Sequence, residues 1–358
     1  MRKISNVDDI VPHNSISQPM VSVIIPAQNE AESIEQSLNS VLNLDYDNLQ
    51  VIVVNDRSTD HTGKILEKMQ SDNDRLQVLH IDELPRGWIG KNYALMKGSE
   101  MANGEYLLFT DADIHFEKST LKRAMHRVLD RKLEHLSILF ELRVKSGLLA
   151  AMMIELGGML LLRFQPWKAK YPASKHYMGV GAFNLVSSFA YQQIGTHRSI
   201  SMAPIDDIML GKCIKQKGFR QECLTGYGYV AVEWYRSVPE MIKGLQKNIY
   251  AAFNYNLALV SVATIMLAVT GLLPQLVFLA TAGPTRLLSA LLILLRLLSF
   301  AYGASRNGLP MRYAIWSLIS PLGAIYTIWH ATLTTLFHNG ITWRNTFYSL
   351  SDIKKYKF

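Results

Sequence analysis

Short apolar runs alternate with amphipathic segments through the first third of the chain. Apolar and β-branched residues dominate positions 21–25, 51–54, 77–81 and 106–109, and polar or acidic residues follow the runs. Between the runs, apolar side chains recur at helical spacing, as at Ile34, Leu38 and Val41. The alternation predicts an α/β fold of Rossmann-like type, with helices on both faces of a mostly parallel sheet. Ligands of such sheets bind beyond the carboxyl ends of the strands.

After residue 250 the pattern changes to long apolar stretches, at 257–280, 287–302 and 315–337. The first and third reach the roughly 20 residues needed to cross a bilayer core, whereas the second is shorter and contains Arg296. The basic tail after Asn339 is expected on the cytoplasmic side, which three crossings from a cytoplasmic N-terminal domain would not allow. We therefore predict a multi-pass protein of the cell membrane in which one of the three stretches does not cross.

Another apolar segment, at 146–167, lies within the first part of the chain. It contains Glu155 and Arg163 and is followed by sequence typical of a soluble domain. These features predict a helix that lies in the membrane interface rather than one that spans the bilayer. A buried core helix is the alternative.

The chain has 358 residues, a formal net charge of +8 and only two cysteines. Two cysteines make neither a disulfide framework nor a metal-ligand cluster, which is consistent with a reducing, cytosol-facing domain. A basic chain can attract nucleic acid or an anionic lipid surface. Because the sequence has no basic helix or aromatic strand pattern, we expect a membrane and a phosphate-bearing substrate, and no nucleic acid. The first 20 residues contain no apolar segment of the signal-peptide type.

The segment TDAD places Asp111 and Asp113 one residue apart, directly after the apolar run at 106–109. Two neighbouring carboxylates repel each other, and a turn could direct both at one ligand. Carboxylate oxygens with open positions beside them suit Mg²⁺ or Mn²⁺, which take their remaining ligands from water and substrate phosphates. A solvated turn in which one aspartate caps a helix is the simpler alternative.

Six segments follow one another in a specific order: VSVIIPAQNEAESI, VIVVNDRSTDHT, GWIGKNYAL, YLLFTDADIHF, GVGAFNLVSSFAYQQIG and PIDDIMLGKCIKQKGFR. Together they resemble family 2 of the inverting glycosyltransferases. The C-terminal part, ending in GITWRNTFYSL, is similar to that of bacterial ceramide glucosyltransferase-like and carotenoid glycosyltransferases. The resemblance implies a GT-A catalytic domain at 21–253, preceded by a tail at 1–20. A transmembrane helical region at 254–339 and a basic tail at 340–358 would follow it.

The resemblance also implies roles for individual residues in binding a nucleoside diphosphate sugar, with a UDP-sugar as the expected donor. The nucleoside pocket would be lined by Pro26, Ala27, Asn29 and Glu30. Asp56 would contact the uracil or ribose, and Lys91 would neutralise diphosphate charge. Asp111 would face the diphosphate, and Asp113, with Asp111, would hold the Mg²⁺ or Mn²⁺ ion. Without the resemblance, Asp56 is equally compatible with a turn-forming residue, and Lys91 with a solvated lysine at a helix start.

The last of the six segments contains Asp206 and Asp207 at the start of a predicted helix. Carboxylates in a first helical turn are favoured by the helix dipole, which is a sufficient structural explanation. The resemblance implies instead that the second acid is the general base, because a hydroxyl acceptor must lose its proton as it attacks the sugar. We expect Asp207 to have this role.

The sequence departs from the processive members of the family, which carry a Gln-x-x-Arg-Trp motif. The nearest match, at Gln246, continues with Ile249 and Tyr250. We therefore expect one sugar to be transferred from a nucleoside diphosphate sugar to a hydroxyl or carboxylate of a membrane lipid. Two alternatives are a processive, polysaccharide synthase-like transferase and a non-catalytic membrane protein that binds nucleotide-sugar. A nucleotidyltransferase would require a glycine-rich basic loop after the first strand, where the sequence has PAQNE.

Overall fold

The computed structural model describes residues 4–12, 18–344 and 346–356, and the chain forms two compact units. Unit 1 comprises Met1–Glu141 and Phe164–Val232, and unit 2 comprises Leu142–Arg163 and Glu233–Phe358. These units group the segment at 142–163 with the C-terminal helices, whereas the predicted catalytic domain ran without interruption over 21–253. The functional boundaries at 20, 253 and 339 remain a prediction.

Unit 1 is built on a seven-stranded sheet in the order β3-β2-β1-β4-β8-β6-β9. The strands are β1 (Val21–Ala27), β2 (Leu49–Asp56), β3 (Leu76–Ile81), β4 (Tyr106–Phe109), β6 (His135–Leu139), β8 (Asn184–Ser187) and β9 (Gln221–Thr225). All neighbouring pairs are parallel except those made by β8, which runs antiparallel between β4 and β6. The prediction of a mostly parallel α/β sheet is therefore confirmed.

The core of this sheet follows from the apolar runs in the sequence. Every residue of β2 is buried, as expected for a strand covered on both sides. The register places Val23 of β1 opposite Val51 of β2 and Leu108 of β4. Strand β1 continues through Pro26 to Ala27, two residues beyond the predicted run.

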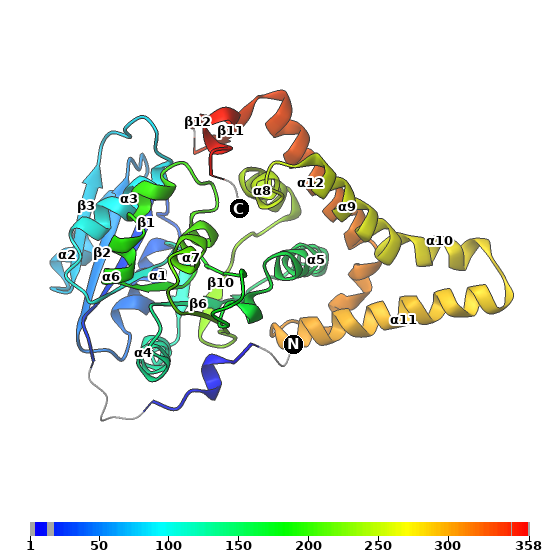
Figure 1. Cartoon of the computed structure of the whole chain (residues 1–358), viewed down its shortest axis with the longest axis horizontal. Coiled ribbons are helices and arrows are strands. Elements are labelled where there is room, and N and C mark those ends of the chain that lie inside the picture. The colour runs from blue at the N-terminus through cyan, green and yellow to red at the C-terminus, as the bar shows by residue number, and fades with distance from the viewer. Residues whose placement is uncertain (1–3, 13–17, 345, 357–358) are drawn as a thin grey trace. The chain divides into compact units, whose positions relative to one another are not determined.

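Helices of unit 1 connect the strands and pack on the sheet (Figure 1). They are α1 (Ile34–Leu42), α2 (Thr62–Ser71), α3 (Gly90–Glu100), α4 (Thr120–Arg131), α6 (Ser188–Gln193) and α7 (Asp206–Gln216), with the short 3₁₀ helices η1 (Val7–Asp9), η2 (Pro166–Lys168) and η3 (His197–Ile200). Helix α3 approaches β1 and β2 closely at Gly98, where an added Cβ would lie 2.6 Å from Ile24 Cγ2. The predicted N-terminal tail contains η1 and a bridge from Asn6 to Thr225, and its residues 1–3 and 13–17 lie outside the described part.

A smaller sheet completes the strand arrangement. Strand β5 (Ile114–Phe116) follows the TDAD segment and pairs antiparallel with β10 (Val230–Val232). The short strand β7 (Glu141–Leu142) lies next to β10 in the same sheet. Because β5 begins directly after Asp113, the two aspartates occupy a tight connection between strands of two different sheets.

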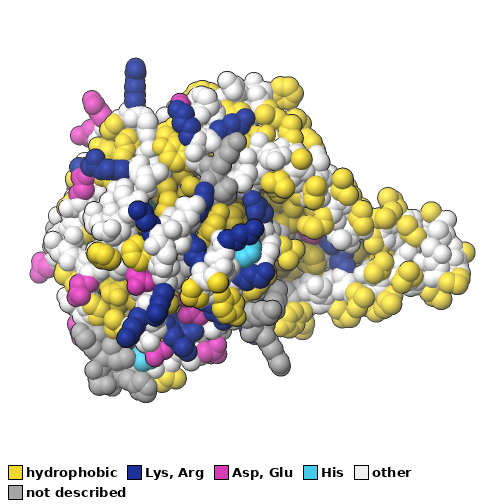
Figure 2. Space-filling model, viewed as in Figure 1, with side chains coloured by type: hydrophobic (Ala, Val, Ile, Leu, Met, Phe, Trp, Pro, Cys, Tyr) yellow, Lys and Arg dark blue, Asp and Glu magenta, His cyan; other side chains and the backbone are white. Residues whose placement is uncertain are grey.

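Unit 2 is mainly helical. Its elements are α5 (Gly147–Phe164), α8 (Val238–Ala252), α9 (Leu257–Leu267), the π-helical turn η4 (Ala268–Leu272), α10 (Leu273–Ala280), α11 (Gly283–Arg306), η5 (Met311–Leu318), α12 (Ser320–Phe337), β11 (Gly340–Trp343), β12 (Thr346–Ser349) and α13 (Leu350–Ile353). Helices α10 and α11 lie side by side as a hairpin, and α12 packs along α8 (Figure 1). Apolar side chains cover the visible surface of the α10–α11 pair (Figure 2).

Three helical segments among the described residues are long and apolar enough to cross a membrane: Gly147–Lys168, Leu257–Ala280 and Gly283–Arg306. The first predicted stretch, 257–280, agrees with the structure. The second was predicted too short, because the helix continues on both sides of 287–302. The third, 315–337, is not one helix: it is divided into η5 and α12 at Ile319, and α12 is not among the three candidates. Buried serine and threonine side chains lower the apolar character of α12.

We predict that Leu108→Ala destabilises unit 1 by about 2–5 kcal/mol, because it opens a cavity in a packed core. Leu108 is completely buried, between β1 and β8. Denaturant unfolding of the purified protein in detergent measures the change. Val11→Ala is the control, since Val11 is 69% exposed and its truncation should change stability by no more than about 0.5 kcal/mol. Equal effects of the two substitutions would contradict the packing described here.

Candidate active site

One small cavity of unit 1 brings together residues from five parts of the chain. Its lining consists of Lys91, Leu95, Phe109, Thr110, Asp111, Gly181, Asn184, His197, Asp206 and Asp207. Three of the residues implied by the sequence, Lys91, Asp111 and Asp207, therefore line the same space. The cavity lies beyond the carboxyl end of β4, where ligands of parallel sheets bind.

Lys91 is the cation at the centre of this group. It lies in the first turn of α3, and its Nζ is 2.7 Å from Asp111 Oδ1 and 3.3 Å from Asp206 Oδ1. Burial by itself disfavours the ammonium, but the neighbouring carboxylates of Asp111 and Asp206 raise the pKa of Lys91 above its ordinary value. Lys91 is therefore charged, and it joins two acidic segments that are almost one hundred residues apart in the chain.

Gly181 fixes the positions of two of the acids. Its N–H donates to Asp207 Oδ2 at 2.8 Å, and its carbonyl accepts from the Asp111 N–H at 3.1 Å. A Cβ at this position would lie 2.7 Å from Asp111 Oδ2. Because β8 is antiparallel to β4, with Asn184 opposite Phe109, the loop before β8 lies next to the end of β4. The glycine-rich segment GVGAFN thus contacts the acids themselves.

Asp207 lies in the first turn of α7 and accepts two backbone N–H groups. Gly181 donates to one carboxylate oxygen, and Ile208 donates to the other at 2.8 Å. Burial, together with the charge of Asp206, raises the pKa of Asp207 to about 6. The carboxylate is held in one orientation, and its pKa is near the value that suits a proton acceptor at neutral pH.

Asp113 is half-buried and close to other acids. Burial, with the charges of Asp111 and Glu30, raises the pKa of Asp113 to about 7. A carboxyl group in this condition gains from a nearby cation, which would favour its ionised form. No group of three or more His, Cys, Asp or Glu residues with metal-binding geometry occurs among the described residues. The two aspartates nevertheless fit Mg²⁺ or Mn²⁺, since such ions bind through one or two carboxylates and substrate phosphates.

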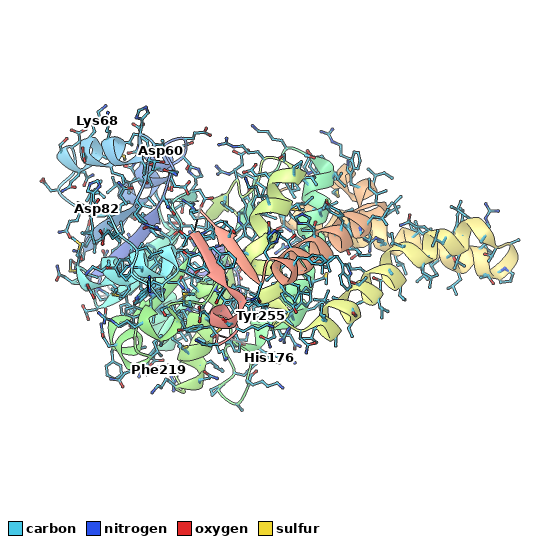
Figure 3. All side chains as sticks on the ribbon, turned by 90° about the horizontal axis from the view of Figure 1, so that it is seen from above. Asp60, Lys68, Asp82, His176, Phe219 and Tyr255 are labelled. Atoms are coloured by element: carbon cyan, nitrogen blue, oxygen red, sulfur yellow. The ribbon has the colours of Figure 1, made fainter. Side chains whose placement is uncertain are left out.

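Residues of the implied nucleoside pocket occupy the loop after β1 and are tied to the loop after β2. Asn29 has a left-handed backbone with φ of 55°, and its Oδ1 accepts the Thr59 N–H at 2.8 Å. The N–H of Glu30 donates to Thr62 Oγ1 at 2.8 Å, and that of Ala31 to Asp60 Oδ2 at 3.2 Å. Figure 3 shows Asp60 beside α2, which also carries Lys68. Pro26 and Ala27 form the end of β1. The two loops thus form one connected edge.

Asp56 ends β2 and is almost completely buried. Arg57 binds it with two parallel hydrogen bonds of 2.7 and 3.0 Å. A Cβ on Gly90 would lie 2.5 Å from Asp56 Oδ2, so the carboxylate is also close to the start of α3. The implied contact between Asp56 and a uracil or ribose remains a prediction.

Sequence reasoning did not identify two polar residues of the cavity, His197 and Asn184. His197 is buried against Phe109, and its Nδ1 lies 2.7 Å from the Tyr191 hydroxyl. Burial lowers the pKa of His197 to about 3, so the imidazole is neutral. The Oδ1 atom of Asn184 lies 2.6 Å from His135 Nε2. A single histidine or asparagine carries no pattern in a sequence, and only the antiparallel position of β8 brings Asn184 to the site.

Comparison with known proteins identifies a family that part of this chain resembles. The sequence model of Glycosyl transferase family 2 matches residues 22–140, which contain β1, β2, β4 and the TDAD segment. This part of the chain is thus similar to a family 2 glycosyltransferase domain.

Two curated relatives and one solved structure illustrate the similarity. The putative teichuronic acid biosynthesis glycosyltransferase TuaG of Bacillus subtilis is 32% identical over 114 residues, 32% of this chain and 44% of TuaG. The 4,4'-diaponeurosporenoate glycosyltransferase of Staphylococcus haemolyticus is 23% identical over 247 residues, 64% of this chain and 60% of the relative. The mannosyltransferase PcManGT of Pyrobaculum calidifontis, solved with GDP-Man and Mn2+, covers 92% of this chain and 90% of its own, with 19% identity and a TM-score of 0.56.

The similarity to PcManGT shows the fold, which is the predicted GT-A fold. The aligned part of this chain spans 44%, 24% and 34% of the lengths of three curated relatives that it matches. Only this aligned region is common to these proteins, and most of each relative has no counterpart in it.

We predict that Mn²⁺ affinity, measured by calorimetry in the presence of UDP, rises as the pH increases from about 6 to 8. Asp113, with its pKa near 7, is largely protonated below that pH and must lose its proton to bind a cation. Below the pKa the affinity should fall by up to about tenfold per pH unit. Asp113→Asn should bind Mn²⁺ weakly at every pH. Wild-type affinity without pH dependence would exclude Asp113 as a ligand.

Proposed function

We propose that the protein is an inverting, metal-dependent glycosyltransferase. It transfers one sugar from a nucleoside diphosphate sugar, with UDP-sugar the expected donor, to a hydroxyl or carboxylate of a membrane lipid. The observation that carries the proposal is the convergence of Lys91, Asp111 and Asp207 on one cavity at the carboxyl edge of the sheet. A cation for the diphosphate and a fixed carboxylate for the acceptor lie there together.

Asp207 is the proposed general base for a hydroxyl acceptor. The acceptor oxygen attacks the anomeric carbon of the donor sugar while its proton passes to the carboxylate of Asp207. The bond between the anomeric carbon and the diphosphate oxygen breaks, and the nucleoside diphosphate leaves with the bonding electron pair. One displacement of this kind inverts the anomeric configuration. The pKa of Asp207, about 6, leaves most of the carboxylate ready to accept a proton at neutral pH.

Lys91, Asp111 and Asp113 are the proposed diphosphate-binding group. Asp111 and Asp113 would hold Mg²⁺ or Mn²⁺, which, when bound, neutralises charge on the leaving diphosphate. Lys91 forms ion pairs with Asp111 and Asp206. Its ammonium group is proposed to bind a phosphate oxygen of the donor. Pro26, Ala27, Asn29, Glu30 and Asp56 are proposed to position the nucleoside. The bound GDP-Man and Mn2+ named for PcManGT support a donor of this class.

A lipid acceptor is supported by two observations. The S. haemolyticus relative is named for diaponeurosporenoate, an apolar carboxylate, and three segments of this chain can span a membrane by length and composition. We therefore place the protein in the cell membrane as a multi-pass protein whose catalytic domain faces the cytoplasm. Single transfer is favoured over processive synthesis because Ile249 and Tyr250 replace the Arg and Trp of the processive motif.

The function is tested by comparing lipids of cells that express the protein with lipids of cells that express Asp113→Asn. Mass spectrometry should find a lipid one hexose-type sugar heavier only with the wild-type protein. Purified protein with Mn²⁺ should also release nucleoside diphosphate from a UDP- or GDP-sugar when that lipid is added. Absence of both activities across the donor panel would refute the transferase proposal.

The role of Asp207 is tested with Asp207→Asn, which keeps the shape of the side chain but cannot take a proton. For a hydroxyl acceptor, turnover should fall by ~10²–10⁴-fold while nucleotide affinity stays within a few fold. Asp130→Asn, on the surface helix α4, is the control and should keep its turnover.

Mild alkali distinguishes the acceptor types, since it cleaves a sugar ester but not a glycoside. A carboxylate acceptor needs no base, and Asp207→Asn should then retain most of its turnover. A glycoside product with near-normal turnover and a lowered melting temperature would assign Asp207 to structure and make Asp206 the candidate base.

A further inference from the structure

The segment that contains α5 begins and ends at unit 1. Glu141 and Phe164 both belong to that unit, and only Leu142–Arg163 belongs to unit 2. A bilayer cannot pass through a folded sheet, because the hydrocarbon core offers no hydrogen-bond partners for irregular backbone. Both ends of α5 must therefore lie on the same side of the membrane. Although its length and composition would permit a crossing, α5 cannot make one.

A buried ion pair fastens α5 to the middle of α11. Arg296 Nη2 donates to Glu155 Oε2 at 2.5 Å, and Ser320 Oγ donates to the same oxygen at 2.9 Å. Arg296 Nε donates to the Ser317 carbonyl at 3.0 Å. The two charged side chains are only 9% and 12% exposed. Separating them would leave each charge buried without compensation, at a cost of several kcal/mol. Helix α5 therefore contacts α11 at the position of Arg296, and the depth of α5 in the membrane sets the depth of Arg296.

The two helices cross steeply. In Figure 1, α5 is seen nearly along its own axis, whereas α11 runs across the picture. An α5 that lies in the plane of the membrane is therefore compatible with an α11 that runs across it. The C-terminal half of α11 contacts the protein on one face, where Ala304 is buried in a cluster with Ala150 and Leu309, while Leu298 and Tyr302 on this half are exposed.

The part of α11 before Arg296 is exposed and rich in leucine. It exposes Leu287, Leu288, Leu291, Leu292, Leu294 and Leu295, and α10 beside it exposes Leu273, Leu276 and Leu279. The 13 residues from Gly283 to Leu295 span about 20 Å at 1.5 Å per residue. An interfacial helix lies about 5–10 Å below the membrane surface. The two lengths add up to about 25–30 Å, close to the ~30 Å thickness of a hydrocarbon core.

Charges mark the two ends of this hairpin. Arg286, near the turn between α10 and α11, is the one charged residue from Leu257 to Leu295, and it covers the Phe278 ring at 4.7 Å. Arg306 is the last residue of α11, Arg312 follows it, and Lys243 and Lys247 precede α9. The excess of positive charge therefore lies at the open end of the hairpin, as the positive-inside rule requires of the cytoplasmic side.

We propose that the chain crosses the membrane twice, through Leu257–Ala280 and back through Gly283–Arg306, with α5 lying in the interface on the side of unit 1. Helix α12 is not a third crossing: it packs along α8 and buries Thr327, Thr332 and Thr335 within the protein. The basic C-terminal tail then returns to the side of unit 1. This arrangement resolves the orientation problem that three crossings would create.

Cysteine labelling tests the arrangement, using a full-length protein in which Cys213 and Cys223 are replaced by serine and alanine. Single cysteines are introduced by Lys145→Cys and Ala173→Cys on either side of α5, by Ala282→Cys at the hairpin turn, and by Ser351→Cys near the C-terminus. A membrane-impermeant maleimide is applied to inverted vesicles and to spheroplasts. Labelling of all four positions after detergent solubilisation is the control for reactivity.

The first, second and fourth cysteines should be labelled only in inverted vesicles, and the one at 282 only in spheroplasts. Labels on opposite sides for positions 145 and 173 would overturn the interfacial placement of α5. A cysteine at 282 labelled from the cytoplasmic side, or from neither side, would overturn the double crossing, and one at 351 labelled in spheroplasts would restore a third crossing. The inference rests on the proposed membrane location. Labelling needs no turnover, so its failure is distinct from failure of the transferase activity.

Discussion

The concentration of negative charge at the carboxyl edge of one sheet is the constraint on which the active-site structure depends. The charge of Asp111 acts on both Asp113 and Asp207, and the charge of Asp206 also acts on Asp207. Like charges at such separations, away from bulk water, cost energy unless a cation or a proton compensates them. Lys91 compensates part of this charge through two ion pairs, and burial, with the neighbouring acids, raises the pKa values of Asp113 and Asp207. The site is arranged to receive further positive charge.

The backbone geometry around the acids follows from the need to bring separate segments this close. Parallel strands deliver the loops after β1, β2 and β4 to one edge, but the loop before a further parallel strand would arrive at the opposite edge. The antiparallel direction of β8 brings Gly181 back to Asp111 and Asp207. A side chain at 181 would collide with the Asp111 carboxylate, and one at 179 would collide with the backbone of Asp207. Small residues are therefore required where the two acidic segments meet.

Unit 2 has exposed apolar surface where the active site has buried charge. Its helices expose leucines along α10 and the first half of α11, a surface that water does not favour and a bilayer does. Its charges at Glu155 and Arg296 are enclosed by each other and by Ser317 and Ser320. The same two residues that make the apolar segments look imperfect in the sequence are the ones that join α5 to α11.

Much of this architecture was determined by the sequence alone. The apolar runs specified β1, β2 and β4 because a strand covered on both faces needs continuous apolar side chains. The edge strand β3 was specified by a shorter run that also contains the exposed residues Gln77 and His80. The acids after those strands could be assigned to one edge because parallel strands end together. The composition after residue 250 required an apolar environment. The start of helix α7 could be predicted from the helical spacing of Ile205, Ile208 and Met209.

Tertiary structure alone decided the rest. The ion pairs of Lys91 join residues about 20 and 115 positions apart, and no local pattern encodes such contacts. The direction of β8 depends on the strands it pairs with, since a four-residue strand is compatible with either orientation. The division of 315–337 into η5 and α12, and the pairing of Glu155 with Arg296, depend on packing between helices distant in the chain. Hydrophobic periodicity fixes which face of an element is buried, but the partner that covers that face is chosen only when the chain folds.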